Sequence, residues 1–358
     1  MTVARVAVAG ASGYTGAELV RLLAQHPKVT LTAVTSEKSA GASVASVFPH
    51  LRNAVRLTFE ALAPEALSKR ADLVFLALPH TKSMPAVASC LPMGVKVVDL
   101  SADFRLKDPH AFEHWYQTPH SHPDLLKQAV YGLPELHRTE IAQAQLVASP
   151  GCYPTAAILQ LAPLIAQGLI VPDTIVIDAK SGISGAGRSP ALPYHFPEAH
   201  ESLEPYKIGL HRHLPEIEQE LNYMHGRGLS HPVPSQSGTV TVVFTPHLVP
   251  MNRGILSTAY CRLKTPQDLV SLQALYRDFY KNEPFVRIFD EVMPNPRHVK
   301  GSNFCDVAVH QDKRAGWVVT VAALDNLVKG AAGQAIQAMN LMLGYPEDTG
   351  LAAPGAYP

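Results

Sequence analysis

The segment "RVAVAGASGYTGAELVRLL", residues 5–23, decides the fold of the first half of the chain. It combines a short apolar run typical of a strand, a loop with three glycines, and a helix whose apolar residues recur at helical spacing. "VTLTAVTS", residues 29–36, then returns to a strand. Glycines in such a loop allow a tight turn and let backbone amides approach a pyrophosphate, which the N-terminus of the following helix attracts. The segment therefore predicts a βαβ unit that binds a dinucleotide.

The glycines of this loop follow a GxxGxxG spacing, one residue longer than the usual dinucleotide fingerprint. A glycine pattern alone also fits a structural turn, so the prediction depends on the order of strand, loop, helix and strand. The cofactor-binding candidates in the loop are Gly10, Ser12, Gly13, Tyr14, Thr15 and Gly16.

The end of the second strand, "SEKS", residues 36–39, bears on the type of cofactor. An acidic side chain at this place usually binds the ribose 2′-hydroxyl of NAD, whereas hydroxyls and a cation accept the 2′-phosphate of NADP. Glu37 fits NAD, while Ser36 and Lys38, together with Ser39, fit NADP. The sequence favours NADP and leaves NAD open.

Further apolar runs extend the alternating pattern to about residue 150. The strand candidates "DLVFLAL", "VKVVDLS" and "AQLVAS" start at residues 72, 95 and 144. Strands that alternate with helices predict an α/β fold with a parallel sheet. Residues 105–140 are rich in proline and histidine and lack periodicity, so we expect an ordered loop excursion or a lid there.

The second half of the chain has a different pattern. With 358 residues, two domains are expected. Strand candidates come in runs, which predicts a mostly antiparallel sheet; they are "TIVIDAKSG", "GTVTVVFTPHLV", "GILSTAYCRL", "CDVAVHQD" and "WVVTVAAL", starting at residues 174, 238, 254, 305 and 317. We expect the last apolar helix pattern, residues 327–344, to return and pack on the first domain.

The composition excludes several classes of function. Hydrophobic residues make up 47% of the chain and charged residues 17%, and thirty basic residues balance thirty acidic ones. We therefore expect no nucleic-acid or membrane partner, and a small anionic ligand must be bound locally. The N-terminus runs into a strand rather than a signal peptide, and the four cysteines are widely dispersed, which together favour a cytoplasmic location.

One cysteine stands out by its neighbours. Cys152 lies in "SPGCYPT", residues 149–155, ahead of an apolar helical run, and Pro154 suits the first turn of a helix. We expect Cys152 just before a helix N-terminus, where the positive end of the helix dipole stabilises a nucleophilic thiolate. The alternative, a small buried hydrophobe, fits the other three cysteines better.

A nucleophilic thiol needs an acid or base partner, usually a histidine that the fold brings close. Among 17 histidines the best candidates are His211 and His213 in "GLHRHLPEIEQEL", just before a predicted helix. Which of the two acts stays open at this point. The His-x-His spacing also suggests a metal, but no third ligand stands out, so we expect no metal.

Three arginines beside glycine turns are candidates for substrate contact, because a planar guanidinium suits carboxylate or phosphate. They are Arg105 in "SADFR", Arg188 in "SGISGAGRS" and Arg253 in "PMNRG". The alternative for each is an ordinary surface ion pair. Together, the thiol, the dinucleotide loop and the arginines indicate that an acyl group is captured as a thioester and receives a hydride from a nicotinamide.

Eight motifs in order resemble the N-acetyl-gamma-glutamyl-phosphate reductase family, NADP-dependent enzymes of arginine biosynthesis. They are "GASGYTGAELVRLL", "DLSADFRL", "YGLPEL", "SPGCYPTAA", "SGISGAGR", "HRHLPEIEQEL", "FTPHLVPMNRGIL" and "NLVKGAAGQAIQAMN", and they span nearly the whole chain. The resemblance implies an oxidoreductase that reduces N-acetyl-gamma-glutamyl phosphate to the 5-semialdehyde and phosphate.

The resemblance also implies two domains and a homo-oligomer, a tetramer or a dimer. A Rossmann-type NADP-binding domain is expected at residues 1–150 with 328–358. An α+β catalytic and oligomerisation domain of the glyceraldehyde-3-phosphate and aspartate-semialdehyde dehydrogenase type is expected at residues 151–327.

Carried over by motif, the resemblance implies roles for single residues. Cys152 is the expected nucleophile, and a histidine of "HRH" is the acid or base, with His213 preferred over His211. Three further residues are expected near the nicotinamide: Ser184, Gly185 and Asn326. The rivals are an aspartate-semialdehyde dehydrogenase, against which "HRHLPEIEQEL" argues, and a dinucleotide-binding redox sensor without catalysis.

Overall fold

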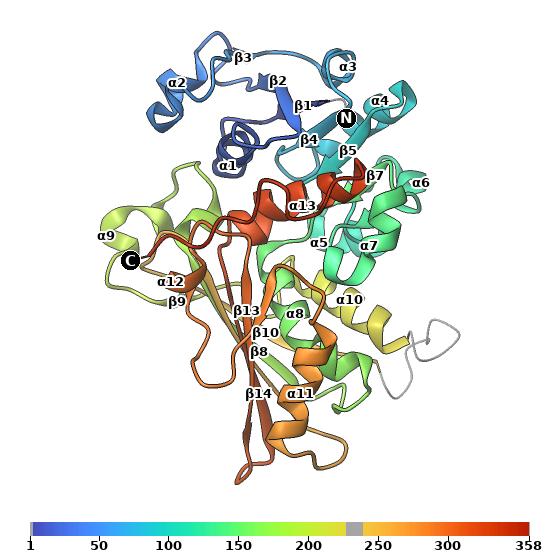
Figure 1. Cartoon of the computed structure of the whole chain (residues 1–358), viewed down its shortest axis with the longest axis vertical. Coiled ribbons are helices and arrows are strands. Elements are labelled where there is room, and N and C mark those ends of the chain that lie inside the picture. Colours follow the sequence, from blue (N-terminus) through green and yellow to red (C-terminus); the bar gives the residue numbers. More distant parts are fainter. Residues whose placement is uncertain (1–2, 227–238, 358) are drawn as a thin grey trace. The chain divides into compact units, whose positions relative to one another are not determined.

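The computed structural model describes residues 3–226 and 239–357. The chain divides into two compact units, the first formed by Met1–Gly151 and Ala331–Ala353 and the second by Cys152–Gly330 and Pro354–Pro358 (Figure 1). Residues 354–357 group with the second unit.

The first unit is built on a seven-stranded sheet in the order β3-β2-β1-β4-β5-β7-β6, with every neighbouring pair parallel. The strands are β1 (Ala4–Ala9), β2 (Val29–Thr35), β3 (Phe59–Glu60), β4 (Leu73–Leu76), β5 (Lys96–Asp99), β6 (Val130–Tyr131) and β7 (Leu146–Ala148). The central strand β4 is buried along its whole length, which explains its continuous apolar sequence. The predicted parallel sheet is confirmed.

Helices connect these strands, as the sequence pattern predicted for a doubly wound sheet. They are α1 (Tyr14–Leu23), α2 (Val44–Val47), α3 (Pro64–Ser68), α4 (Ser83–Cys90), α5 (Pro109–Tyr116), α6 (Pro123–Leu126), α7 (Pro134–Gln143) and α13 (Gly333–Met342), with short 3₁₀ turns at Pro49–Leu51 and Leu91–Met93. Helix α13 packs against α1, α7 and β5, so a C-terminal segment completes the first unit.

Residues 105–140, expected to be an ordered loop excursion or a lid, are ordered but mainly helical, so the expected loop is wrong. The segment contains α5, α6, the short strand β6 and most of α7, and a proline is the first residue of each helix. Proline is favoured at that position because its missing N–H has no helical partner there and its fixed φ suits the first turn. Phe112 and Tyr116 stack with ring centroids 4.7 Å apart and belong to the hydrophobic core, so the segment is packed.

The second unit contains a seven-stranded mixed sheet in the order β12-β13-β14-β11-β8-β10-β9. The strands are β8 (Ile175–Gly182), β9 (Glu204–Pro205), β10 (Val242–Val249), β11 (Ile255–Cys261), β12 (Val286–Ile288), β13 (Cys305–Asp312) and β14 (Trp317–Leu324). Two pairs, β8 with β10 and β12 with β13, are parallel and the rest are antiparallel. This confirms the mostly antiparallel prediction; Gly238, where one predicted strand began, lies outside the described residues.

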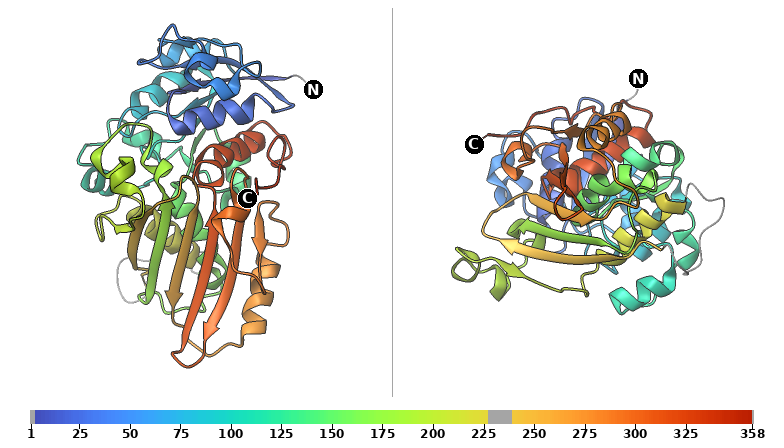
Figure 2. Two further views of the ribbon diagram at one scale, coloured as in Figure 1. Left: turned by 90° about the vertical axis from the view of Figure 1, so that its left-hand side faces the viewer. Right: turned by 90° about the horizontal axis from the view of Figure 1, so that it is seen from below.

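Three helices cover one face of this sheet: α8 (Cys152–Ala166), α10 (Leu214–Gly226) and α11 (Leu269–Phe279) (Figure 2). The shorter elements are α9 (Phe196–Ala199), α12 (Pro296–Val299), 3₁₀ turns at Ile183–Ala186 and Leu192–Tyr194, and a π-helical turn at Val328–Ala332. Within the described residues, no helix is long and apolar enough to cross a membrane.

Helix α8 is buried almost throughout and contains an internal proline, Pro163. Because proline has no N–H, the carbonyl of Leu159 one turn earlier loses its helical partner. The hydroxyl of Tyr280 donates to that carbonyl at 2.5 Å, and the hydroxyl of Tyr276 donates to the carbonyl of Gln160 at 2.6 Å. Tyrosine hydroxyls from α11 and its C-terminal end thus donate hydrogen bonds to carbonyl groups of α8 next to the interruption.

Candidate active site

The glycine loop joins β1 to α1, and its three glycines differ in what they permit. Gly10 has φ +79°, and a Cβ there would lie 2.4 Å from the carbonyl oxygen of Ala77; a Cβ at Gly16 would lie 2.6 Å from the carbonyl oxygen of Gly10. At Gly13 the nearest atom to such a Cβ is 3.9 Å away, and this residue is the N-cap of α1. The first and third glycines therefore allow close packing, while the middle one leaves open space at the helix N-terminus, where an anion is favoured.

The end of β2 lies against this loop. The Ser12 and Ser36 hydroxyls are 2.7 Å apart, and Ser36 Oγ accepts the N–H of Ser39 at 3.1 Å. Ser36 is buried, while the side chains of Glu37 and Lys38 are exposed. An exposed acid and an exposed cation stand side by side, so the geometry by itself keeps both types of cofactor open.

Cys152 is the first residue of α8, so the helix begins at the cysteine itself rather than just after it, as the sequence predicted. It is partly exposed, whereas the other three cysteines are buried. Burial raises the pKa of the Cys261 thiol to about 12 and also raises that of Cys90, so these thiols remain protonated. Cys152 thus combines access with a helix N-terminus, the setting that favours a reactive thiolate.

The fold brings the histidine pair next to Tyr153, the residue that follows Cys152. The ring of Tyr153, the residue after Cys152, lies 5.5 Å from that of His211 and 6.0 Å from that of His213, measured between centroids. The two histidine rings are 4.8 Å apart. Both histidines directly precede α10, as predicted, and α10 packs against α8.

The two ring nitrogens of His211 both have hydrogen-bond partners. The main-chain N–H of His213 donates to Nδ1 at 3.1 Å, and Nε2 lies 3.3 Å from the hydroxyl of Tyr206. Burial foremost, and then the positive charges of Lys207 and Arg212, lower the pKa of His211 to about 4. His211 is therefore a neutral imidazole near pH 7.

Three candidates for contact with a nicotinamide lie together in the second unit. Asn326 Nδ2 donates to the hydroxyl of Ser184 at 3.0 Å, and Asn326 Oδ1 accepts the N–H of Gly254 at 2.7 Å. A Cβ built on Gly185 would lie 3.5 Å from Asn326 Nδ2. Asn326 thus links the turns that follow β8 and β10.

The three candidate arginines differ in their surroundings. Arg105, in the first unit, donates from Nε to the carbonyl of Ser149 and from Nη2 to that of Leu100, so it holds the segment that leads to Cys152. Arg253 Nε lies 3.1 Å from Oδ2 of the fully buried Asp325, and Arg188 is exposed on its loop. Arg188 and Arg253 belong to the second unit.

The chain has relatives of known name over almost its entire length. It is 52% identical over 356 residues to an N-acetyl-gamma-glutamyl-phosphate reductase of Geotalea daltonii, covering 99% of both chains. It is 52% identical over 348 residues to that of Geobacter metallireducens, covering 97% of both, and 49% identical over 355 residues to that of Pelotomaculum thermopropionicum, covering 99% of both. The chain belongs to the N-acetyl-gamma-glutamyl-phosphate reductase family.

The two units of this N-acetyl-gamma-glutamyl-phosphate reductase family member match two domain families. Residues 5–144 match the semialdehyde dehydrogenase NAD binding domain, and residues 152–326 match the semialdehyde dehydrogenase dimerisation domain. Both matches agree with the predicted combination of a Rossmann-type domain and an α+β domain.

Solved structures confirm the fold class. Aspartate semialdehyde dehydrogenase II of Vibrio cholerae superposes with a TM-score of 0.72 at 16% identity, covering 96% of this chain and 99% of that one. Aspartate semialdehyde dehydrogenase of Candida albicans, solved with NADP, gives a TM-score of 0.70 at 17% identity, with coverages of 96% and 99%. At these identities the likeness concerns the fold.

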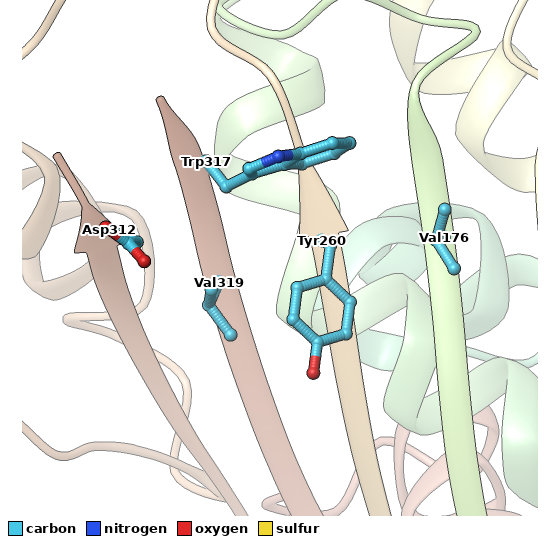
Figure 3. Close-up of a pocket in the computed structure, with 5 residues that line it drawn as sticks. All are labelled: Val176, Tyr260, Asp312, Trp317 and Val319. Carbon is cyan, nitrogen blue, oxygen red and sulfur yellow. The ribbon is translucent and has the colours of Figure 1, made fainter. Parts of the chain in front are cut away.

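The outer face of the second sheet, opposite the helices, has a shallow hollow of about 300 Å³. It is lined by Val176, Tyr260, Asp312, Trp317 and Val319, which come from neighbouring strands (Figure 3). The guanidinium of Arg262 lies 4.6 Å from the Trp317 ring. The hollow is mainly apolar and is formed by strands, so it belongs to the surface of the sheet and not to the surroundings of Cys152.

Several residues around Cys152 and the histidine pair escaped the sequence interpretation. Tyr206 and Tyr153 contact the histidine pair, Asp325 holds Arg253, and Gly330 lies against Cys152. The sequence offered one signal for Tyr153, namely its position directly after Cys152. In the described residues, no group of three or more His, Cys, Asp or Glu side chains is arranged to hold a metal ion.

Proposed function

We propose that the protein uses NADPH to reduce N-acetyl-gamma-glutamyl phosphate to N-acetylglutamate 5-semialdehyde and phosphate, a step of arginine biosynthesis. The observation that carries the proposal is the setting of Cys152, a partly exposed thiol at the start of α8 whose neighbour in sequence, Tyr153, contacts the rings of His211 and His213. Relatives about half identical over the full chain bear the name of this activity.

The first half of the reaction is acyl transfer to the thiol. The thiolate of Cys152 attacks the carbonyl carbon of the acyl phosphate, the carbon–oxygen bond to phosphate breaks, and a thioester remains on the enzyme. The N-terminus of α8 stabilises the thiolate before the attack. Phosphate leaves as a stable anion, so this half requires no strong acid.

The second half converts the thioester to an aldehyde. When bound, the nicotinamide supplies a hydride to the thioester carbon. His213 donates a proton to the oxygen that gains negative charge, and takes the proton back as the carbon–sulfur bond breaks and Cys152 leaves as a thiolate. A histidine suits both directions of transfer near neutral pH.

The cofactor proposal assigns the pyrophosphate to the loop of residues 10–16, where Gly13 leaves open space at the N-terminus of α1. NADP is proposed over NAD because the exposed cation of Lys38 at the end of β2 suits a 2′-phosphate. Ser36 would support this site by holding Ser12 and the turn after β2. The residues Ser184, Gly185 and Asn326 are proposed for the nicotinamide end.

The substrate carries two anions and an uncharged amide, so arginines are proposed as its receptors. Arg253 is oriented through its Nε by Asp325, and Arg188 lies on an exposed loop. Both can present a planar guanidinium to a carboxylate or phosphate. Arg105 is proposed as a third receptor, and it also supports the segment before Cys152.

We also propose a homo-oligomer, either a dimer or a tetramer, assembled through the outer face of the second sheet. This face has the hollow described above, and Val243 and Tyr260 are 58% and 39% exposed on its strands. A reducing, cytoplasmic location is proposed because the four cysteines, all within the described residues, form no disulfide. Light scattering after size exclusion, with Tyr260→Glu as the interface variant, tests the assembly.

The proposed function is tested by running the reaction backwards. We expect phosphate-dependent reduction of NADP with N-acetylglutamate semialdehyde and little or none with aspartate semialdehyde, whose ammonium group would need a buried carboxylate partner. Comparable rates with the two aldehydes, or a rate independent of phosphate, would contradict the assignment. A protein that binds NADP but turns over neither aldehyde would instead be a sensor.

A further inference from the structure

Three side chains of the second unit form a chain of hydrogen bonds beside the nucleophile. His211 Nε2 lies 3.3 Å from Tyr206 Oη, and Tyr206 Oη lies 3.4 Å from Tyr153 Oη. Tyr153 Oη in turn lies 3.1 Å from the main-chain carbonyl oxygen of His247. Tyr153 follows Cys152 in the sequence, and the charge of Cys152 acts on the hydroxyls of both Tyr153 and Tyr206.

The carbonyl at one end fixes the direction of every hydrogen bond in the chain. A carbonyl oxygen only accepts, so Tyr153 must donate its single hydroxyl hydrogen to His247. Tyr153 Oη then accepts from Tyr206, and Tyr206 Oη accepts from His211. The hydrogen of the His211 ring is therefore on Nε2.

The other side of the His211 ring leads to the same tautomer. Nδ1 accepts the main-chain N–H of His213 at 3.1 Å, so this nitrogen carries no hydrogen. With Nε2 already carrying a hydrogen, only Nδ1 could take up a proton, and that would break its hydrogen bond with the N–H of His213. The ring is locked as a neutral imidazole from both sides.

We propose that His211 is a positioning residue, fixed in its neutral Nε2–H form by Tyr206 and by the main chain of His213, and that proton transfer belongs to His213. The kinetic consequences of this inference rest on the proposed function. The tautomer itself does not, because it follows from the hydrogen bonds of the chain.

The charges around His211 agree with this division of roles. The neighbours that bear on its titration are the cations of Lys207 and Arg212, the buried hydroxyls of Tyr206 and Tyr153, and the ring of His213. A second positive charge on His211 would lie within 5 Å, centroid to centroid, of a protonated His213 ring, and like charges at that separation disfavour each other. A neutral His211 therefore leaves His213 able to accept a proton.

The hydroxyls are held in their neutral form as well. Burial foremost, and also the charge of Cys152, raise the pKa of both Tyr153 and Tyr206 above the usual value for a phenol. Both hydroxyls therefore keep their hydrogens throughout the working pH range. The direction of the chain is then the same whether Cys152 is a thiol or a thiolate.

The kinetic test uses Tyr206→Phe, which removes only the hydroxyl oxygen that accepts from His211. We expect turnover to fall about tenfold, the size of one ordinary hydrogen bond, with an unchanged Michaelis constant for NADP. Tyr223→Phe, on the exposed face of α10, is the matched control and should retain the wild-type rate. An undiminished rate in Tyr206→Phe would overturn the inference.

The pH profile separates the two histidines. His211→Asn keeps an oxygen near the place of Nδ1, so it still accepts the His213 N–H but no longer reaches Tyr206. We expect this variant to retain the near-neutral limb in the pH dependence of kcat/KM, at a rate lowered about tenfold. Loss of that limb in His211→Asn and its retention in His213→Asn would reverse the roles.

Nitrogen NMR of the full-length protein labelled with ¹⁵N-histidine tests the tautomer without any substrate. The signals absent from His211→Asn identify His211, and we expect a neutral Nε2–H ring from about pH 5.5 to 8. A protonated ring near pH 6, or the Nδ1–H tautomer, would overturn the inference. If the wild-type protein shows no phosphate-dependent turnover, the proposed function fails, while these spectra still decide the state of His211.

Discussion

A Cβ atom at Gly330 would lie 2.8 Å from Cβ of Cys152, closer than side-chain carbons approach each other in proteins. Gly330 lies in the π-helical turn of residues 328–332, and its N–H donates to the carbonyl of Asp325 at 2.9 Å. Its φ is not in the left-handed region, so space rather than conformation requires the glycine. The absence of a side chain at Gly330 therefore leaves room for Cys152, in a kind of turn often found at functional sites.

Gly330→Ala should displace Cys152 and lower turnover by about 100-fold, because small misplacements of a reacting group are costly. The rate at which iodoacetamide alkylates Cys152, followed by mass spectrometry, should change as well. The control is Gly226→Ala at the end of α10, where a Cβ meets no atom within 4 Å. Wild-type turnover and alkylation in Gly330→Ala would show that the contact is easily relieved.

Cys152→Ser should abolish turnover and leave NADP binding intact. A serine hydroxyl without a strong base is a poor nucleophile at neutral pH, whereas the glycine loop that is proposed to bind the cofactor lies in the other unit. Fluorescence titration with NADPH measures binding, and Cys90→Ala, which removes a buried thiol, serves as the control. Substantial residual turnover in Cys152→Ser would exclude the covalent mechanism.

His213→Asn should lower the turnover number by about 100-fold or more, within the range of a general acid or base. The change should fall on kcat, with little effect on the Michaelis constant for NADP. His200→Asn, an exposed histidine on the turn after α9, is the control and should behave as wild type. A mild effect of His213→Asn would mean that another group transfers the proton.

Lys38→Ala should raise the Michaelis constant for NADPH about tenfold and leave that for NADH nearly unchanged, since a charge-assisted hydrogen bond to the 2′-phosphate is lost. Glu37→Ala is the matched variant at the neighbouring exposed position and should not weaken the binding of NADPH. If the wild-type protein uses NADH and NADPH equally, Lys38 does not decide the choice of cofactor, and Glu37 contributes more to it.

Local patterns in the sequence predicted the parts of the fold that depend on local chemistry. The apolar runs of β1 and β4 and the glycine loop predicted the parallel sheet, and "SPGCYPT" predicted a thiol at a helix N-terminus. Residues 105–140 were misinterpreted because proline both breaks and starts helices, and composition does not distinguish the two uses.

The remaining features depend on contacts between distant segments. Gly330 meets Cys152 across 178 residues of sequence, and Tyr206 gains its role from the direction of a hydrogen-bond chain that ends at His247. No local pattern marks such residues, since a glycine in a helix or a tyrosine near a strand has many ordinary uses. Predicting them from sequence would require the packing of α8 against the rest of its unit.

The proline inside α8 has a consequence for the thiol about three helical turns away. Tyr276 and Tyr280 hold the carbonyls of Gln160 and Leu159 through buried hydrogen bonds, so α8 cannot slide along its axis or rotate without losing both. These hydrogen bonds hold α8 at its middle, and the first residue of this helix is Cys152. The reach of the sulfur toward a substrate is thereby set partly by two phenol groups more than 100 residues further along the chain.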